Sequence, residues 1–144
     1  MSQQQNYTFD KNLQLKDAGL VASSAAAQVA SADKILDLGT GRVGGVAVLD
    51  IGAIEVATGD ESYHIEAQFS NSATFASTNI VGPVLKTGDS TVNFGSADTA
   101  VGRYELPFTN EYAGTIYRYM RLYTRIAGTI ATGINYTGWV AKVA

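Results

Sequence analysis

The sequence contains no cysteine and only one histidine, His64. Without cysteine the chain has no disulfide, no thiol nucleophile and no cysteine-ligated metal site. Charged residues make up only 16% of the chain, whereas about a quarter is usual in soluble domains. So few charges are expected where much of the surface is buried against partners. The net charge of −3 argues against a general nucleic-acid coat.

Long apolar runs and targeting signals are also missing. No run of the sequence approaches the about 18 apolar residues that a membrane span requires. Residues 1–7 are polar and lack the basic and apolar regions of a signal peptide. We therefore expect neither a signal peptide nor a membrane partner.

The residue groupings that carry catalysis are absent. His64 lies on the polar face of a predicted strand beside Glu66, and we interpret it as a solvent-facing residue. The neighbouring Asp60 and Glu61 lack a recognisable cation-binding spacing. The glycine-rich stretch 39–45 lacks the Gly-Lys-Ser/Thr ending of a phosphate-binding loop. The sequence predicts no enzyme, no cofactor and no metal.

Apolar residues that alternate with polar ones dominate the chain. The pattern is clearest over 62–69. Similar segments lie elsewhere in the chain, at 7–15, 34–38, 46–56, 92–94, 104–108, 115–127 and 130–143. Gly133 and Gly138 predict a bulge or a close backbone approach in the last of these. About eight strands between Gly-, Asn- and Asp-bearing turns predict an all-β chain, a jelly-roll-like antiparallel β-sandwich with an extended N-terminal arm.

Three regions are predicted along the chain. Residues 1–17 form an N-terminal arm or first strand, residues 18–32 a connector, and residues 33–144 a single β-sandwich domain. The connector is rich in alanine, but its serines and missing caps favour an extended or partly helical segment over a regular helix. In the arm, an apolar row of one parity must be covered by the chain's own sandwich or by a neighbouring subunit, which we favour. The row is Tyr7, Phe9, Leu13 and Leu15.

The segment 117–125 places tyrosines and arginines on one face of a predicted strand, namely Tyr117, Tyr119, Arg121, Tyr123 and Arg125. These two residue types are the most enriched at protein interfaces. They also stack on nucleic-acid bases, or they pack across strands on a solvated face. We interpret the face as a protein–protein interface. Nucleic acid is the weaker alternative because the rest of the chain is acidic.

Charge is unevenly distributed along the sequence. No lysine or arginine falls between Val43 and Leu85, where the acids are Asp50, Glu55, Asp60, Glu61 and Glu66. The C-terminal part carries Arg103, Arg118, Arg121, Arg125 and Lys142. This separation predicts either complementary faces between copies or a scatter of charges among loops.

Four short motifs carry a family resemblance. They are FDKNLQLKDA at 9–18, ILDLG at 35–39, QFSNSATF at 68–75 and YMRLY at 119–123, the last followed by Gly128-Thr129 and Thr132-Gly133. In this order they resemble the small jelly-roll capsid cement (decoration) proteins of tailed bacteriophages. The resemblance spans nearly the whole chain, except the glycine-rich 39–45 loop and residues 112–117.

The resemblance implies a structural virion protein on the outer capsid surface. Such a protein binds the major capsid protein, stabilises the capsid lattice and meets other copies of itself as dimers or trimers. We expect a dimer here. A different class, a carbohydrate-binding β-sandwich of a phage tail or host-recognition module, needs an aromatic platform beside polar groups. Trp139 with Asn135 is the best candidate for that platform.

Overall fold

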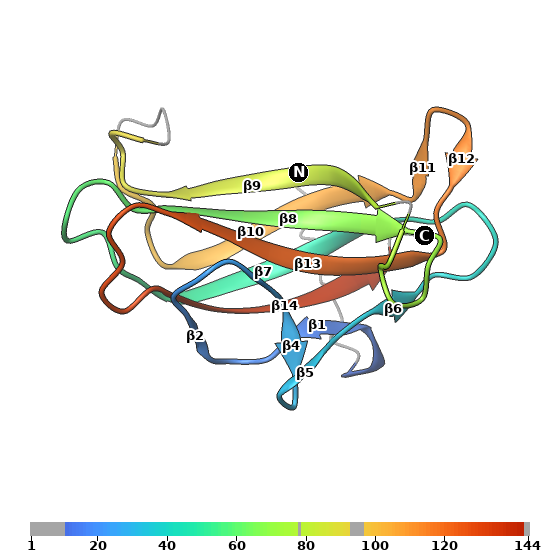
Figure 1. The fold of residues 1–144 in the computed structure, drawn as a ribbon, viewed down its shortest axis with the longest axis horizontal. Helices are drawn as coiled ribbons and strands as arrows, with labels where there is room; N and C mark the ends of the chain where they lie inside the picture. The colour runs from blue at the N-terminus through green and yellow to red at the C-terminus, as the bar shows by residue number, and fades with distance from the viewer. Residues whose placement is uncertain (1–10, 78, 93–96, 143–144) are drawn as a thin grey trace, which may run out of the picture.

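The described part of the chain is an antiparallel β-sandwich (Figure 1). The computed structural model describes residues 11–77, 79–92 and 97–142. The predicted all-β sandwich is confirmed. Tyr7 and Phe9 of the predicted arm lie outside the described residues. No helix in the described ranges is long and apolar enough to cross a bilayer.

The described elements are mostly strands. In chain order they are η1 (Lys11–Leu13), β1 (Gln14–Lys16), β2 (Leu20–Val21), β3 (Ala25–Ala26), β4 (Gln28–Val29), β5 (Ala32–Asp33), β6 (Leu36–Asp37), β7 (Gly44–Ile54), β8 (Ser62–Ser70), β9 (Ile80–Gly88), β10 (Gly102–Thr109), β11 (Glu111–Tyr112), β12 (Thr115–Ile116), β13 (Tyr119–Ala127) and β14 (Ile134–Lys142).

Two five-stranded sheets form the sandwich. Sheet A has the order β1-β14-β7-β10, with β2 also paired to β14. Sheet B has the order β3-β13-β8-β9, with β6 also paired to β13. Among the long strands, the chain changes sheet at every step except from β8 to β9. This order favours a jelly roll, which stays a prediction at that finer level.

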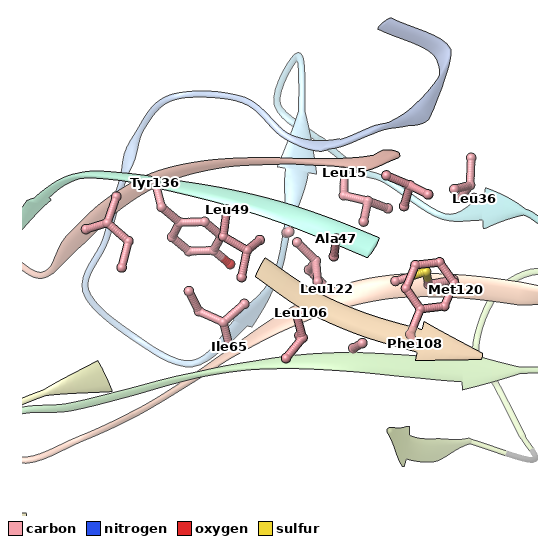
Figure 2. Close-up of a cluster of buried hydrophobic side chains, with 14 of the residues drawn as sticks. Leu15, Leu36, Ala47, Leu49, Ile65, Leu106, Phe108, Met120, Leu122 and Tyr136 are labelled. Carbon is pink, nitrogen blue, oxygen red and sulfur yellow. The ribbon is translucent and has the colours of Figure 1, made fainter. Parts of the chain in front are cut away.

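The core lies between the two sheets, where each sheet buries the apolar side chains of its inner face. Figure 2 shows side chains from both sheets meeting there, including Leu49 of β7, Ile65 of β8 and Leu122 of β13. These three are fully or almost fully buried. The parity predicted for 62–69 is therefore confirmed, since Tyr63, Ile65, Ala67 and Phe69 are all 0% exposed.

The sandwich begins nearer the N-terminus than the sequence predicts. Leu15 of β1 is 0% exposed and belongs to the core, and β1 pairs with β14. In the predicted connector 18–32, β2 pairs with β14 and β3 pairs with β13. Residues 14–32 thus contribute short strands to both sheets. The segment is extended, because backbone pairing to the two long strands replaces the helix that alanine alone would favour.

Lys16 is a buried charge that holds this N-terminal region in place. The residue is 4% exposed. Its Nζ donates hydrogen bonds to the carbonyl oxygens of Asp17, Gly19 and Tyr136 at 3.0, 3.0 and 2.8 Å. The Tyr136 carbonyl belongs to β14, so one ammonium ties the turn after β1 to the centre of sheet A. Burial lowers the pKa of Lys16, and the nearby Asp17 charge acts in the opposite direction.

The edge strand of sheet B lies earlier in the chain than the sequence predicts. The alternation at Val92 and Phe94 predicts a strand there, but Val92 follows β9 in a turn and is 39% exposed. Phe94 lies outside the described residues. The strand forms earlier, as β9, where Gly82 and Pro83 obscure the alternation. A proline is tolerated because β9 is the last strand of its sheet.

Carboxylates stabilise the loops at one end of the sandwich. Glu61 is 0% exposed, and its carboxylate accepts hydrogen bonds from the backbone N–H groups of Thr58, Gly59 and Asp60 and from the Thr58 hydroxyl. The Asp60 carboxylate accepts from the Thr129 N–H and hydroxyl, each at 3.0 Å. Burial alone would raise the pKa of Glu61. The hydrogen bonds from Thr58 and from other groups outweigh burial and lower the pKa to about 2.

These carboxylates predict acid sensitivity. A carboxyl group whose pKa is lower in the folded state stabilises the fold above its unfolded pKa and loses that effect as the pH falls. For Glu61 the loss runs from about pH 4.5 down to about 2. We expect urea unfolding midpoints of the wild type to fall across this window. Glu61→Gln should be less stable at pH 7 and show a shallower fall.

The matched control for that titration is Glu105→Gln, which alters an exposed glutamate on β10. Its midpoint should follow the wild-type pH profile. If Glu61→Gln also follows the wild-type profile in parallel, Glu61 is not a source of the acid sensitivity.

Candidate protein interface

The outward face of β13 carries the predicted tyrosines and arginines. Alternation buries Met120, Leu122 and Thr124 toward the core, with exposed fractions of 0, 0 and 1%. The side chains of opposite parity are Tyr119, Arg121, Tyr123 and Arg125, and we call these four the β13 face. All four are half-buried or exposed. One strand therefore displays them as a continuous row on the outside of sheet B.

The neighbouring strand β8 supplies a polar support for this row. In the antiparallel register Arg121 lies opposite Gln68, and Arg125 lies opposite His64, two residues along β8 from Glu66. Arg121 Nε donates to Gln68 Oε1 at 2.8 Å, and Arg125 Nε donates to Glu66 Oε2 at 2.8 Å. Gln68 Nε2 in turn donates to Glu66 Oε1 at 3.0 Å. A single hydrogen-bonded chain thus fixes both arginines.

Glu66 is the electrostatic centre of this network. Its side chain is only 8% exposed, while that of Arg125 is 54% exposed. Burial alone would raise the pKa of Glu66, but the hydrogen bonds from Arg125 and Gln68 more than reverse this and lower it. Glu66 is therefore ionised at neutral pH, and it holds the Arg125 guanidinium against the sheet.

Arg121 is placed by two aromatic rings. Its Cζ lies 4.4 Å from the centre of the Phe75 ring and 5.6 Å from that of Tyr123. Stacking of this kind favours a guanidinium over an ammonium. Phe75 comes from the loop after β8 and is 6% exposed. The loop therefore folds back so that its ring covers the β13 face at Arg121.

The loop that carries Phe75 is held in a strained conformation. Phe75 has a φ of 57°, in the left-handed region that side-chain-bearing residues avoid. Asn79 Nδ2 donates to the Phe75 carbonyl at 2.8 Å, and the Phe75 N–H donates to the Ser72 carbonyl at 3.1 Å. The Ser70 hydroxyl donates to the Ser77 carbonyl at 2.7 Å. These bonds offset the backbone cost and keep the ring on Arg121.

The other predicted interface residues lie elsewhere. Tyr117 precedes β13 and packs beside Tyr112, with ring centres 6.4 Å apart, against the core. Leu13 is partly buried and packs against its own core. The structure thus separates Tyr117 and Leu13 from the β13 face, while Tyr7 and Phe9 lie outside the described residues. The sequence missed Gln68, Glu66 and Phe75 as parts of the site, although two of them stand in the 68–75 motif.

The separation of charge along the sequence is partly cancelled by ion pairs within the molecule. Arg103 pairs with Asp50 at 2.8 Å, because β10 lies beside β7. Arg125 pairs with Glu66, because β13 lies beside β8. Acidic and basic stretches therefore meet inside one molecule. Because these four residues are paired within one molecule, they do not support complementary charged faces between copies.

The long outer strands leave little room for association by strand addition. The chain has two prolines, Pro83 in β9 and Pro107 in β10, which are the last strands of sheets B and A. Both prolines line one shallow groove with Phe108, Thr109 and Tyr112. Proline cannot donate a ladder hydrogen bond, and it blocks pairing at an edge. At the opposite edges β1 has three residues and β3 has two.

The candidate carbohydrate platform is mostly covered. Trp139 lies on the outer face of sheet A, packed with Val46, Val48 and Ala141, and is 6% exposed. The Arg103 guanidinium lies over its ring, 5.0 Å from the ring centre. The Asn135 side chain accepts a hydrogen bond from the Gly19 N–H at 2.9 Å. Neither residue offers a sugar an open stacking surface in this arrangement.

Metal-binding groupings are also limited. Within residues 11–77, 79–92 and 97–142 no group of three or more His, Asp or Glu side chains could hold a metal ion. His64 Nε2 shares a hydrogen bond of 2.9 Å with the Ser62 hydroxyl on the same strand.

No protein-family model matches the chain, and no curated protein matches its sequence. The four motifs of the family resemblance occupy definite places in the fold. Leu15 and Lys16 of the first motif anchor β1, and Leu36 of the second is buried where β6 meets β13. The third and fourth motifs meet at Arg121, through Gln68, Phe75 and Tyr123.

Proposed function

We propose that this chain is a structural virion protein, a capsid cement that binds the major capsid protein on the outer capsid surface and stabilises its lattice. The carrying observation is the β13 face, a preorganised row of Tyr119, Arg121, Tyr123 and Arg125 supported by buried Glu66 and Gln68. The family resemblance supplies the identity of the partner. The confirmed sandwich and the contact between the third and fourth motifs support it.

The mechanism follows from mass action. A protein that binds only the mature arrangement of a lattice stabilises that arrangement by its binding free energy at each site. Many sites on one particle multiply the effect. A rigid face loses little side-chain entropy on binding, since hydrogen bonds and ring contacts already fix its arginines. Self-association, with a dimer favoured over a trimer, belongs to the same proposal.

The proposal predicts a defined loss for Tyr119→Ala. Tyr119 is half-buried at the start of β13, opposite Ser70, with the Arg118 guanidinium 5.4 Å from its ring centre. Truncating an interface tyrosine removes contact area and a polar tip together. We expect a loss of about 1–2 kcal/mol in binding free energy. Co-sedimentation with mature capsids of the tailed phage whose genome encodes this chain measures it, beside thermal unfolding of the isolated variant.

Leu20→Ala is the control, because Leu20 is 60% exposed on β2, away from the β13 face. It should bind capsids as the wild type does. If wild-type protein stays in the supernatant with both mature and unexpanded capsids, the proposed function is wrong. If the wild type binds capsids and Tyr119→Ala binds them equally well, the β13 face is not the interface.

A further inference from the structure

Arg121 differs from three other arginines of the chain in its charge balance. Arg103, Arg118 and Arg125 each pair with a carboxylate of the same chain, at 2.8, 2.9 and 2.8 Å. Among the described residues Arg121 has no carboxylate within ion-pair distance, and its one hydrogen bond runs from Nε to Gln68. The charge in the middle of the β13 face is therefore not compensated within the described chain.

The surroundings of Arg121 limit how a ligand can approach. The rings of Phe75 and Tyr123 lie against the guanidinium, and Gln68 occupies Nε. The two Nη groups remain as donors, because no described residue accepts a hydrogen bond from them. A guanidinium edge with two parallel N–H donors matches the two oxygens of a carboxylate.

We propose that the Arg121 slot, formed by Gln68, Phe75, Arg121 and Tyr123, receives an aspartate or glutamate side chain of the capsid protein. This inference rests on the proposed function and names the chemistry that the partner presents. Pairing there would neutralise the guanidinium in a partly desolvated position, where a charge-assisted bidentate bond is strongest. The strained backbone at Phe75 holds that residue's ring on the Arg121 guanidinium before the partner binds.

In a second copy of this chain, six of the described carboxylates are already engaged, while Glu105 on β10 is exposed. Asp37, Asp50 and Glu66 are ion-paired within the chain. Glu55, Asp60 and Glu61 accept hydrogen bonds from loop N–H groups. A partner with unpaired acids fits better. A nucleic-acid phosphate fits less well, because buried Glu66 already occupies the neighbouring arginine and the chain is acidic overall.

The test compares Arg121→Gln, Arg121→Lys and Arg103→Gln in co-sedimentation with mature capsids. Arg121→Gln should weaken binding by about 10–100-fold. Arg121→Lys should weaken it by about 10-fold or more, since an ammonium loses the stacked bidentate geometry. Arg103→Gln removes an equal charge from the other sheet and should stay within about twofold. Arg121→Glu combined with reversal of one capsid acid to arginine should restore binding.

The outcomes separate this inference from the proposed function. If wild-type protein does not bind capsids, the proposed function fails. If wild type binds and Arg121→Gln and Arg121→Lys bind equally well, the slot is not used and the inference is overturned. Loss of self-association without loss of capsid binding would overturn the capsid protein as the occupant. Arg121-dependent binding of a fluorescent single-stranded oligonucleotide would overturn the carboxylate.

Discussion

Replacing Gly133 with alanine is expected to lower the free energy of unfolding by about 3–5 kcal/mol. Gly133 has a φ of +97°, and a Cβ built there would lie 2.1 Å from the Val21 carbonyl oxygen and 2.8 Å from its carbon. Both obstacles are backbone, so no side chain can turn away. Relief requires β2 to leave β14, which pairs with it at Val21. Thermal unfolding should show a Tm lower by about 10 °C or more.

The conformational part of this loss can be measured separately. Gly114 has a similar φ of +81°, but a Cβ there meets nothing within 4 Å. Gly114→Ala should therefore cost only about 1 kcal/mol. The difference between the two variants reports the collision with Val21. Equal losses in both variants would show that β2 yields without cost and that the close approach is unimportant.

Lys16→Met is expected to lower the free energy of unfolding by about 2–3 kcal/mol. Methionine keeps an unbranched apolar side chain, one heavy atom shorter than that of lysine, but has no donor for the carbonyls of Asp17, Gly19 and Tyr136. The Tyr136 carbonyl lies on a buried strand, where losing a partner costs most. The ammonium also lies 4.5 Å from the centre of the Tyr136 ring, a contact that methionine keeps only weakly.

Lys86→Met supplies the control for charge removal. Lys86 is exposed on β9, so its replacement should change the urea unfolding midpoint little. Lys16→Met should also speed hydrogen exchange of the amides in β1 and β2. A variant as stable as the wild type would mean that burying the Lys16 charge costs as much as its three hydrogen bonds return.

Strand identity could be predicted where the alternation was long and clean. The 62–69 pattern gives β8, and the 115–127 pattern gives β13 from Tyr119 onward, whereas Thr115 and Ile116 form the separate short strand β12 that pairs with β11. The close backbone approach predicted at Gly133 is also confirmed, while the bulge of the last strand lies between Asn135 and Tyr136 and at neither glycine. The strand β9 was missed, because Pro83 breaks the pattern and only its edge position makes that proline acceptable.

The candidate site could be predicted only in part. Alternation alone places Tyr119, Arg121, Tyr123 and Arg125 together. It cannot place Glu66 and Gln68 beneath the arginines, because that depends on the register between β8 and β13. It also extends the row to Tyr117, which the chain bends away toward Tyr112 before β13 begins. The role of Phe75 depends on a left-handed backbone that no periodicity encodes.

The two prolines at neighbouring edges decide what kind of growth the molecule permits. A bare strand edge is a template, and each added strand presents a fresh edge to the next one. With Pro83 and Pro107 in the terminal long strands, molecules concentrated on one surface cannot extend their sheets through that flank. Contacts made through side chains, such as those of the β13 face, are saturated once each site is occupied and do not extend a sheet. Side-chain contacts of that kind therefore join copies without nucleating a fibre through this flank.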